Sequence, residues 1–349
     1  MDQKDPQTHL SPSFHISYSR LALLDRSPFL FHKKYILGEE IEDKDSTAMN
    51  MGSAVDCLLC QPDEFYNLFA VSTVEKPTGQ MGDYVTALFY NVNNLTYDSQ
   101  LSPEEIIAQA ELKAYQDAGF KRDSLEKVKE RFNAEGKDYY KFLMSSKDKM
   151  VLSFEQFTKA NAAAEVLKNN QFTRRFLAET LEDGLERFYQ HESRFTHNDI
   201  TYVVKLDVIV VDHNNKTIQP IDLKTTGESP YGFTKSMHKY RYDIQAVIYS
   251  HYISTEFIKE KGLEEYQILP FKFIVINVEY PNNPLIWKMS NNDIMVAKMG
   301  LAGESNVKGF WDLLEDLKWH LANDVWDYKR EVYESNGELV TNMYDKTAF

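Results

Sequence analysis

Hydrophobic and polar positions alternate most regularly after Gly184. LERFYQHESRF, TYVVKLDVIVVD and KTIQPIDLKTT are rich in β-branched and aromatic residues, which predicts three strands. The polar turn His213–Asn215 joins the second and third strands into a hairpin. YDIQAVIYSHYISTEFI has helical spacing, and PFKFIVINVEY is apolar enough for a strand buried on both faces. The pattern predicts an α/β fold with a mixed central sheet flanked by helices.

Helical spacing dominates on both sides of this β-rich segment. Two short helices broken at Pro28 are expected over Ser17–Leu37, and one helix over Thr47–Cys60. Two capping boxes predict further helix starts, Ser102 with Glu105 and Ser153 with Gln156. We therefore expect a single domain over residues 1–349, containing a mostly helical insertion at 80–180, a sheet core at 184–280 and C-terminal packing helices at 305–335.

Composition narrows the classes of function. The net charge of −14, from 39 basic and 53 acidic residues, argues against indiscriminate nucleic-acid binding, which needs a basic footprint. The chain has no apolar run of membrane-spanning length and no secretory signal pattern, so we expect a cytoplasmic protein. Cys57 and Cys60 form a C-x-x-C pair that is too small for a four-cysteine site. A redox pair is one interpretation, and two buried hydrophobic residues on one helix is the preferred one.

The predicted hairpin brings charged residues together. Alternation places Asp207 on one face with Val203, Lys205 and Ile209, and places Asp222 and Lys224 on a common face of the next strand. Two carboxylates 4 Å apart repel by about 4 kcal/mol at an effective dielectric constant of 20. A Mg²⁺ ion would reverse the sign of that energy. A structural Asp–Lys salt bridge is the alternative. Pro220 cannot donate a ladder hydrogen bond, so this strand is expected to be irregular or bulged before Asp222.

These segments resemble those of PD-(D/E)XK nucleases. IDLKTT resembles the D-x-K-T signature of the RecB-like branch, VVKLDVIV its first metal-aspartate strand, and YDIQAVIY its Q-x-x-x-Y helix. SYSRLALLDRSPFLFHKKYI resembles the N-terminal element of that branch, with Ser27 where some relatives carry an iron–sulfur cysteine, so no cluster is expected. MGSAVDCLLCQPDEFYNLFAV is similar to an element of RecE-type exonucleases, the exodeoxyribonuclease VIII group, many of them encoded by phages.

The resemblance implies a restriction-endonuclease-like core and a role for each matching residue. Asp207 and Asp222 would bind Mg²⁺, or Mn²⁺ as a substitute, with the carbonyl oxygen of Leu223 as a further ligand. Lys224 would be the catalytic lysine. The other implied positions are Gln245 and Tyr249, which would support the lysine or touch DNA, and Glu186 as an accessory acid.

One position departs from the family pattern. Asp56 stands where the relatives have a metal-binding histidine, four residues after Gly52. Aspartate is also an oxygen donor for Mg²⁺, so Asp56 is predicted to be a metal ligand. The same substitution is compatible with an inactive relative that binds DNA or a protein partner without cutting. An unrelated α/β scaffold with a chance D-x-K is the third interpretation, and the co-occurring elements disfavour it.

The resemblance also implies a substrate and partners. The expected activity is Mg²⁺-dependent hydrolysis of linear duplex DNA from its ends, 5′ to 3′, in recombination or repair. Relatives of the RecE type form rings and work beside a single-strand annealing protein, so a homo-oligomer and such a partner are implied. Lys235, Lys239 and Arg241, in a segment without acidic residues, are candidate contacts to DNA phosphate, and a solvated loop is the alternative.

Overall fold

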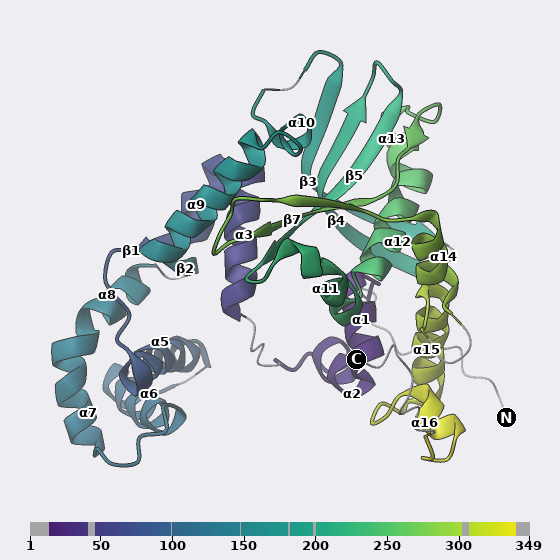
Figure 1. Cartoon of the computed structure of the whole chain (residues 1–349). Helices are drawn as coiled ribbons and strands as arrows, with labels where there is room; N and C mark the ends of the chain where they lie inside the picture. The colour runs from purple at the N-terminus through teal and green to yellow at the C-terminus, as the bar shows by residue number, and fades with distance from the viewer. Residues whose placement is uncertain are drawn as a thin grey trace. The chain divides into compact units, whose positions relative to one another are not determined.

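The predicted hairpin lies at the centre of a six-stranded mixed sheet in the computed structural model (Figure 1). The structure describes residues 14–40, 46–98, 100–146, 148–180, 182–197, 200–301 and 307–339. The strands are β3 (Leu185–His197), β4 (Ile200–Asp212), β5 (Thr217–Thr226), β6 (Gln267–Ile268), β7 (Lys272–Asn277) and β8 (Leu285–Lys288). Their order is β3-β4-β5-β7-β8, and β6 also pairs with β5. The predicted mixed sheet is confirmed: β3, β4 and β5 are antiparallel, and β7 pairs parallel to β5.

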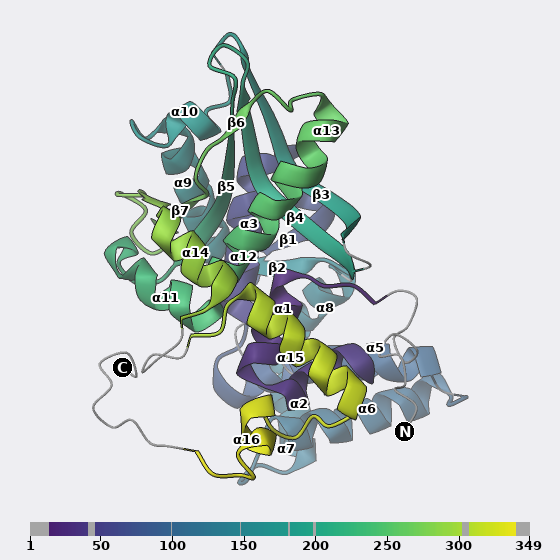
Figure 2. The same ribbon diagram turned by 90° about the vertical axis from the view of Figure 1, so that its right-hand side faces the viewer.

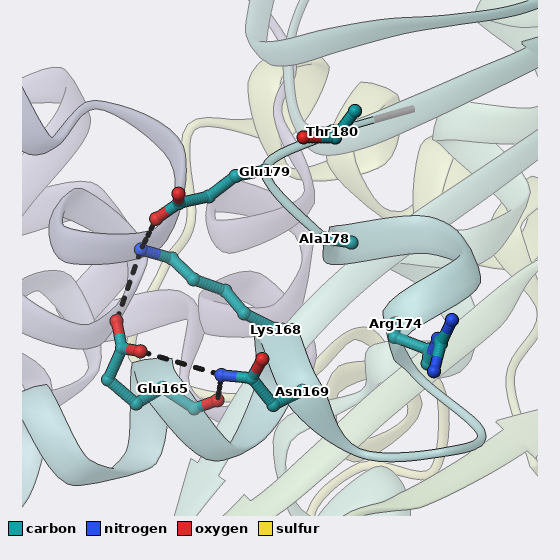
Figure 3. A pocket seen from close by; sticks show the side chains of 7 residues that line it. All are labelled: Glu165, Lys168, Asn169, Arg174, Ala178, Glu179 and Thr180. Carbon is teal, nitrogen blue, oxygen red and sulfur yellow. Dashed lines mark hydrogen bonds and ion pairs between the residues drawn. The ribbon is translucent and has the colours of Figure 1, made fainter. Parts of the chain in front are cut away.

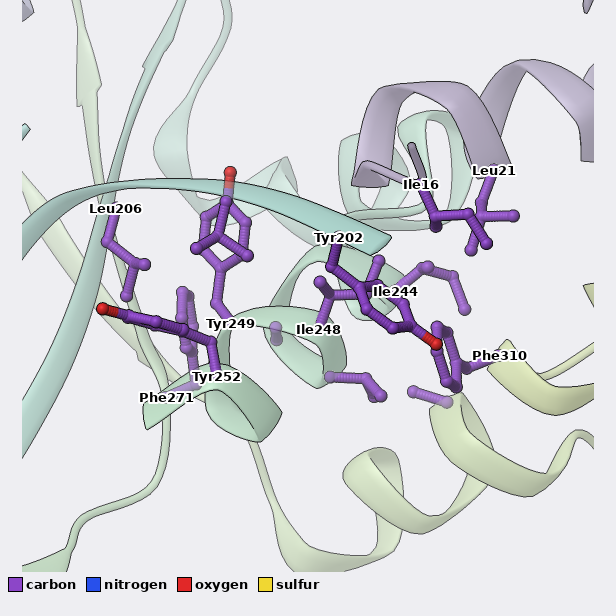
Figure 4. Close-up of a cluster of buried hydrophobic side chains, with 14 of the residues drawn as sticks. Ile16, Leu21, Tyr202, Leu206, Ile244, Ile248, Tyr249, Tyr252, Phe271 and Phe310 are labelled. Carbon is purple, nitrogen blue, oxygen red and sulfur yellow. The ribbon is translucent and has the colours of Figure 1, made fainter. Parts of the chain in front are cut away.

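The helix predicted between β5 and β7 packs on this sheet. It comprises α12 (Tyr242–Tyr252), a π-helical turn η6 (Ile253–Phe257) and α13 (Ile258–Lys261). Figure 4 shows Ile244, Ile248 and Tyr252 of this segment close to Leu206 and Tyr202 of β4. Seven of the eleven residues of α12 are buried, because the helix lies between the sheet and the helices outside it. Burial of this apolar surface stabilises the fold and fixes the side chains that α12 directs at β5.

The terminal segments cover the outer side of α12. The N-terminal helices are α1 (Tyr18–Arg26), α2 (Pro28–Phe31) and the π-turn η2 (His32–Ile36). Ser27 ends α1 and caps α2, so the predicted break before Pro28 is confirmed. Figure 2 shows α15 (Phe310–Asn323) crossing α1, with α14 (Asn291–Met299) before it and α16 (Arg330–Glu334) after it. The remaining segments of this part are α10 (Arg174–Leu177), η5 (Pro230–Gly232) and α11 (Phe233–Tyr240).

The irregularity predicted at Pro220 is wrong for β5 itself. Pro220 pairs with Ile209 in an uninterrupted ladder. The interruption lies in the neighbouring strand: β6 pairs only as far as Ile218, and β7 begins opposite Ile221. The proline lacks a ladder donor where no partner strand is present, so its cost is avoided. The buried Gln219 side chain fills the gap, donating to the carbonyls of Pro220 and Pro270 at 2.9 Å each.

The chain divides into two compact units. The sheet belongs to the unit formed by residues 1–52 and 163–349, and the second unit is Ser53–Ala162. The helical insertion therefore begins and ends earlier than the expected 80–180. The helices α3 (Ser46–Cys60) and α9 (Phe154–Asn169) run from one unit into the other.

The second unit has its own apolar core, built around the buried Tyr84, Val85 and Val128. Both predicted capping boxes are present, with Ser102 paired to Glu105 and Ser153 to Gln156. Its elements are η3 (Pro62–Glu64), α4 (Phe65–Leu68), β1 (Phe69–Ser72), α5 (Gly79–Asp98), α6 (Pro103–Asp117), α7 (Leu125–Arg131), η4 (Phe132–Gly136), α8 (Lys137–Ser145) and β2 (Met150–Ser153).

Cys57 and Cys60 are buried thiols on α3, which agrees with their interpretation as small apolar residues. Within the described ranges, no helix is long and apolar enough to cross a membrane.

Candidate active site

The strands β4 and β5 separate at Asp207. Their pairing runs from Asp212–Thr217 to Val208–Ile221, and the next position would set Asp207 opposite Asp222. There the backbone N–H of Leu223 donates to Asp207 Oδ2 at 2.8 Å. A side-chain carboxylate thus replaces the backbone acceptor of the neighbouring strand. The exchange satisfies the donor and holds the Asp207 carboxylate beside Asp222.

The neighbouring strand β3 is also irregular at this point. Gln190 lies opposite Asp207 in the register, and its backbone φ of 46° falls in the left-handed region. Its side-chain amide donates to Asp207 Oδ1 at 3.2 Å. A positive φ is unfavourable for a residue with a Cβ, and such positions concentrate at functional sites. Asp207 therefore accepts hydrogen bonds from both adjacent strands.

The alternation of β4 changes phase at Asp207. On the C-terminal side, Ile209 and Val211 enter the main core. On the N-terminal side, Leu206 and Val204 enter the same core, whereas Lys205 is exposed. The prediction that Lys205 and Val203 share a face with Asp207 is therefore wrong. The prediction assumes that side chains alternate strictly between the two faces of the strand, and this alternation is interrupted by the local bend at Asp207.

Asp222 is the most buried charged group of the site, with 1% of its surface exposed. Gln245 Nε2 donates to Asp222 Oδ1 at 2.6 Å, and Lys224 Nζ donates to Oδ2 in a short contact. Burial raises the pKa of Asp222 to about 7; the Asp207 carboxylate adds to this increase and Lys224 opposes it. The two carboxylates are therefore close enough to repel each other, as the hairpin predicted.

Lys224 is the compensating cation. Its side chain is 18% exposed, and its ammonium lies 4.5 Å from the centre of the Tyr242 ring. Burial acts to lower the pKa of Lys224, but the Asp222 and Asp207 carboxylates raise it above the ordinary value. The ring face and the carboxylates both favour the charged form. The lysine is thus held as a cation at the carboxylate pair.

Gln245 and Tyr249 complete the cluster from α12. Burial raises the pKa of Tyr249, and the Asp222 carboxylate raises it further, so its hydroxyl stays neutral near pH 7. The second amide atom of Gln245, Oε1, is buried and has no hydrogen-bond partner in the described residues. A buried acceptor without a donor is costly, so it marks a place for a group that the protein itself does not supply.

This donor set fits a divalent cation. Mg²⁺ is commonly bound by one or two carboxylates and keeps several waters. Asp207 and Asp222 supply such a pair, and a water bound to the ion would be a donor for Gln245 Oε1. Among the described residues, no group of three or more His, Cys, Asp or Glu side chains is placed to hold a metal. The fit thus rests on two acidic ligands and on the predicted carbonyl of Leu223.

Asp56 belongs to the second unit, and its role as a ligand remains a prediction. It follows Gly52 by one turn on α3. A Cβ at Gly52 would lie 3.2 Å from Thr225 Oγ1 of β5, closer than ordinary van der Waals contact. The helix α3 therefore approaches β5 closely at Gly52.

Other predicted residues lie away from the carboxylates. Glu186 pairs with Val211, four positions along β4 from Asp207, which is about 13 Å at 3.3 Å per residue. Its carboxylate accepts a hydrogen bond from His213 at 3.1 Å, provided that nitrogen carries the proton. An accessory catalytic role has no support in this position.

The three candidate phosphate contacts differ in their surroundings. Arg241 is bound inside the protein, with its guanidinium on Asp25, on Asp243 at 3.1 Å and on the Lys308 carbonyl at 2.6 Å. These bonds give Arg241 a structural role and correct its expected role as an exposed phosphate contact. Lys235 and Lys239 are exposed on α11 and remain candidates.

Two residues of the site were not expected from the sequence. Gln190 carries no motif, and its positive φ is not a property that a glutamine reveals in a sequence. Tyr242, whose ring covers the Lys224 ammonium, begins the helix that carries Gln245. Its position three residues before Gln245, on the same helical face, was a usable signal.

Comparison with known proteins gives the family. Residues 17–319 match the model of a "PDDEXK-like domain of unknown function (DUF3799)". No curated protein matches the sequence. A crystal structure named "Putative exonuclease", from Eubacterium rectale, is 10% identical, with 94% of this chain and 89% of that chain covered and a TM-score of 0.44. Protein VC1899 from Vibrio cholerae is 14% identical, with 81% and 57% covered and a TM-score of 0.17. The family match spans most of the chain, including every residue of the carboxylate cluster, and the protein therefore belongs to this PDDEXK-like family.

Proposed function

We propose that the protein is a Mg²⁺-dependent deoxyribonuclease that hydrolyses phosphodiester bonds of duplex DNA. The observation that supports this most directly is the shared environment of Asp222. One buried carboxylate binds Lys224 and Gln245 and lies beside the carboxylate of Asp207. A structural salt bridge alone would need neither the second carboxylate nor the buried amide, since both add desolvation cost.

Each side chain has a defined task in this mechanism. Asp207 and Asp222 would hold the metal with the Leu223 carbonyl. The bound ion supplies Lewis acidity toward a phosphate oxygen and lowers the pKa of a bound water. Lys224, kept cationic by the carboxylates, stabilises the negative charge that grows on the phosphate. Gln245 orients Asp222 by donating its amide N–H to that carboxylate, and its Oε1 would accept a hydrogen bond from the attacking water.

Asp56 would add an oxygen donor where relatives use histidine. Aspartate is a harder ligand than imidazole, so it suits Mg²⁺ and Mn²⁺ over softer ions. Asp56→Ala is expected to weaken metal binding, and Asp56→His to shift the preference toward transition metals.

We infer that the substrate is a DNA end. A net charge of −14 opposes binding along the side of a duplex, so binding depends on local cations such as Lys235 and Lys239. The resemblance to RecE-type enzymes supports 5′-to-3′ digestion in recombination or repair, in a homo-oligomer and beside a single-strand annealing protein.

The test compares linear duplex with closed circular plasmid at equal enzyme, in Mg²⁺ or in EDTA. We expect Mg²⁺-dependent loss of the linear form and an intact circle. Cutting of the circle at the same rate would make the protein an endonuclease. Binding without cutting of either form would leave a PD-(D/E)XK protein that has lost catalysis, which the Asp56 substitution favours.

A further inference from the structure

A row of polar and basic side chains crosses the sheet on the face opposite the carboxylates. Residues paired across strands share a face. Arg187 pairs with Val210, and Val210 pairs with Gln219. The row continues through Lys272, which pairs with Lys288 of the edge strand β8. Lys272 Nζ donates to Gln219 Oε1 at 2.5 Å, which places the lysine on this face, whereas its chain neighbour Phe273 lies in the core beneath α12.

The short helix α10 adds another cation to this row. Phe176 of α10 is buried, and two cations flank its ring: Arg175 Cζ at 4.6 Å and Lys272 Nζ at 4.8 Å from the ring centre. The end of α10 is fixed to the sheet, because Arg187 Nη1 donates to the carbonyl of Ala178 at 2.8 Å. Arg175 and Lys288 are exposed, so the face is open to solvent at these two residues.

No carboxylate among the described residues forms an ion pair with this group. In the described part of the chain, Arg175, Lys272 and Lys288 form no ion pair, and Arg187 Nε and Nη2 are buried without a hydrogen-bond acceptor. Burial, together with the charges of Arg175 and Lys288, lowers the pKa of Lys272 to about 8. Cations that lie close together repel one another, and this repulsion lowers their pKa values. An anion placed among them is attracted by all of them.

A neighbouring cavity shows the contrasting arrangement. Figure 3 shows Lys168 of α9 reaching between the carboxylates of Glu165 and Glu179, at 3.4 and 3.1 Å. The cavity has a volume of about 480 Å³. Arg174 also lines the cavity, so its two cations are balanced by two carboxylates and it offers an anion little attraction.

We propose that Arg175, Lys272 and Lys288 form a second binding surface for the phosphate groups of duplex DNA, separate from the carboxylate site. This inference rests on the proposed function, because the anion is identified as DNA phosphate only if the protein acts on DNA. Lysine acts as a point charge on phosphate and arginine as a planar donor, and three cations on one open face suit successive backbone phosphates. The surface supplies affinity without base recognition, and it offsets locally the repulsion that the net charge of −14 imposes.

The experiment measures duplex binding in EDTA, so that cleavage plays no part. A labelled duplex is titrated by fluorescence anisotropy at several salt concentrations, with wild type and Arg175→Gln/Lys288→Gln. The control is Lys259→Gln/Lys318→Gln, which removes two exposed lysines from α13 and α15. Losing two phosphate contacts makes the slope of log K against log salt shallower by about 1.8, since each contact contributes about 0.9. At 0.1 M salt this corresponds to about 60-fold weaker binding.

The outcomes separate this inference from the nuclease proposal. An equal slope for the Arg175/Lys288 variant and wild type overturns the inference, as does absence of duplex binding by wild type. A further arm titrates inorganic phosphate and records Tm. A phosphate-induced rise in Tm that the variant loses, with an unchanged duplex slope, assigns the surface to free phosphate and also overturns it. If the protein cuts DNA in Mg²⁺ but the variant has the wild-type slope, the nuclease proposal stands and this inference fails. If the variant has the shallower slope but wild type does not cut, this inference stands and the nuclease proposal fails.

Discussion

Lys224 and Lys272 lie on adjacent strands of one sheet, yet their surroundings are opposite. Lys224 faces α12 and has two carboxylates beside it, so its pKa is raised despite burial. Lys272 faces α10 with Arg175 and Lys288 near it, so burial and these cations lower its pKa to about 8. The sheet thus separates a compensated cation from an uncompensated one. A buried cation that is paired with carboxylates is stable within the protein itself. A cluster of cations without carboxylate partners indicates a ligand that brings negative charge.

The largest effect is expected from Asp222→Asn. Asparagine keeps the shape and accepts from Lys224, but it removes one negative charge from the metal site. Cleavage of linear duplex should fall by about 10³-fold or more, since several kcal/mol of transition-state stabilisation are lost. The matched control is Asp212→Asn, in the same hairpin, whose carboxylate accepts from the turn residues Asn214 and Asn215. Near-normal cutting by folded Asp222→Asn would refute the assignment.

Lys224→Met tests compensation on the carboxylate face through stability. It leaves Asp222 buried with its charge unpaired, which typically costs about 3–5 kcal/mol. Burial raises the pKa of Asp222 to about 7, so at pH 6 the carboxyl can be protonated and needs less compensation. We expect the loss in free energy of unfolding to be larger at pH 9 than at pH 6, measured by urea denaturation. Equal losses at both pH values would mean that the ion pair does not carry the effect.

Lys272→Met tests the opposite face. The folded pKa of about 8 lies below the ordinary value for lysine, so the charged form opposes folding at neutral pH. Replacing it should raise Tm at pH 7, and the gain should shrink as pH rises from 8 toward 10.5, where wild type is relieved of the same charge. The variant should also bind duplex more weakly. A lower Tm at pH 7 would show that the lysine serves the fold and not a ligand.

The smallest effect is expected from Gln190→Gly. Glycine relieves the positive φ of 46°, which costs a residue with a Cβ about 1 kcal/mol, but it removes the amide that orients Asp207. Cleavage should slow by about tenfold, equivalent to roughly 1.4 kcal/mol, while the protein is no less stable. Reduced cleavage together with a lower Tm would instead indicate a mainly structural residue.

The sequence predicts the carboxylate site better than its surroundings. Alternation and a short hairpin turn place Asp207 against Asp222, and helical spacing brings Gln245, because these relations are local or lie within one supersecondary unit. The prediction for Arg241 is wrong because one of its two carboxylate partners, Asp25, is 216 residues away in the chain, and the charge of Asp243, two residues on, does not by itself reveal an ion pair. The cationic row was not visible either, since it depends on the register of strands that are not neighbours in the sequence.

The short turn between β4 and β5 also sets an order of assembly. Only His213–Lys216 separate the two strands, so their pairing closes a very small loop and is favoured kinetically. The parallel pairing of β5 with β7 must wait for more than forty further residues, including the helix that carries Gln245. During folding, both carboxylates can therefore face each other before the helix that carries the amide anchoring Asp222 has docked. Until that helix docks, the positive charge of Lys224, on β5 itself, is what offsets the negative charges of Asp207 and Asp222.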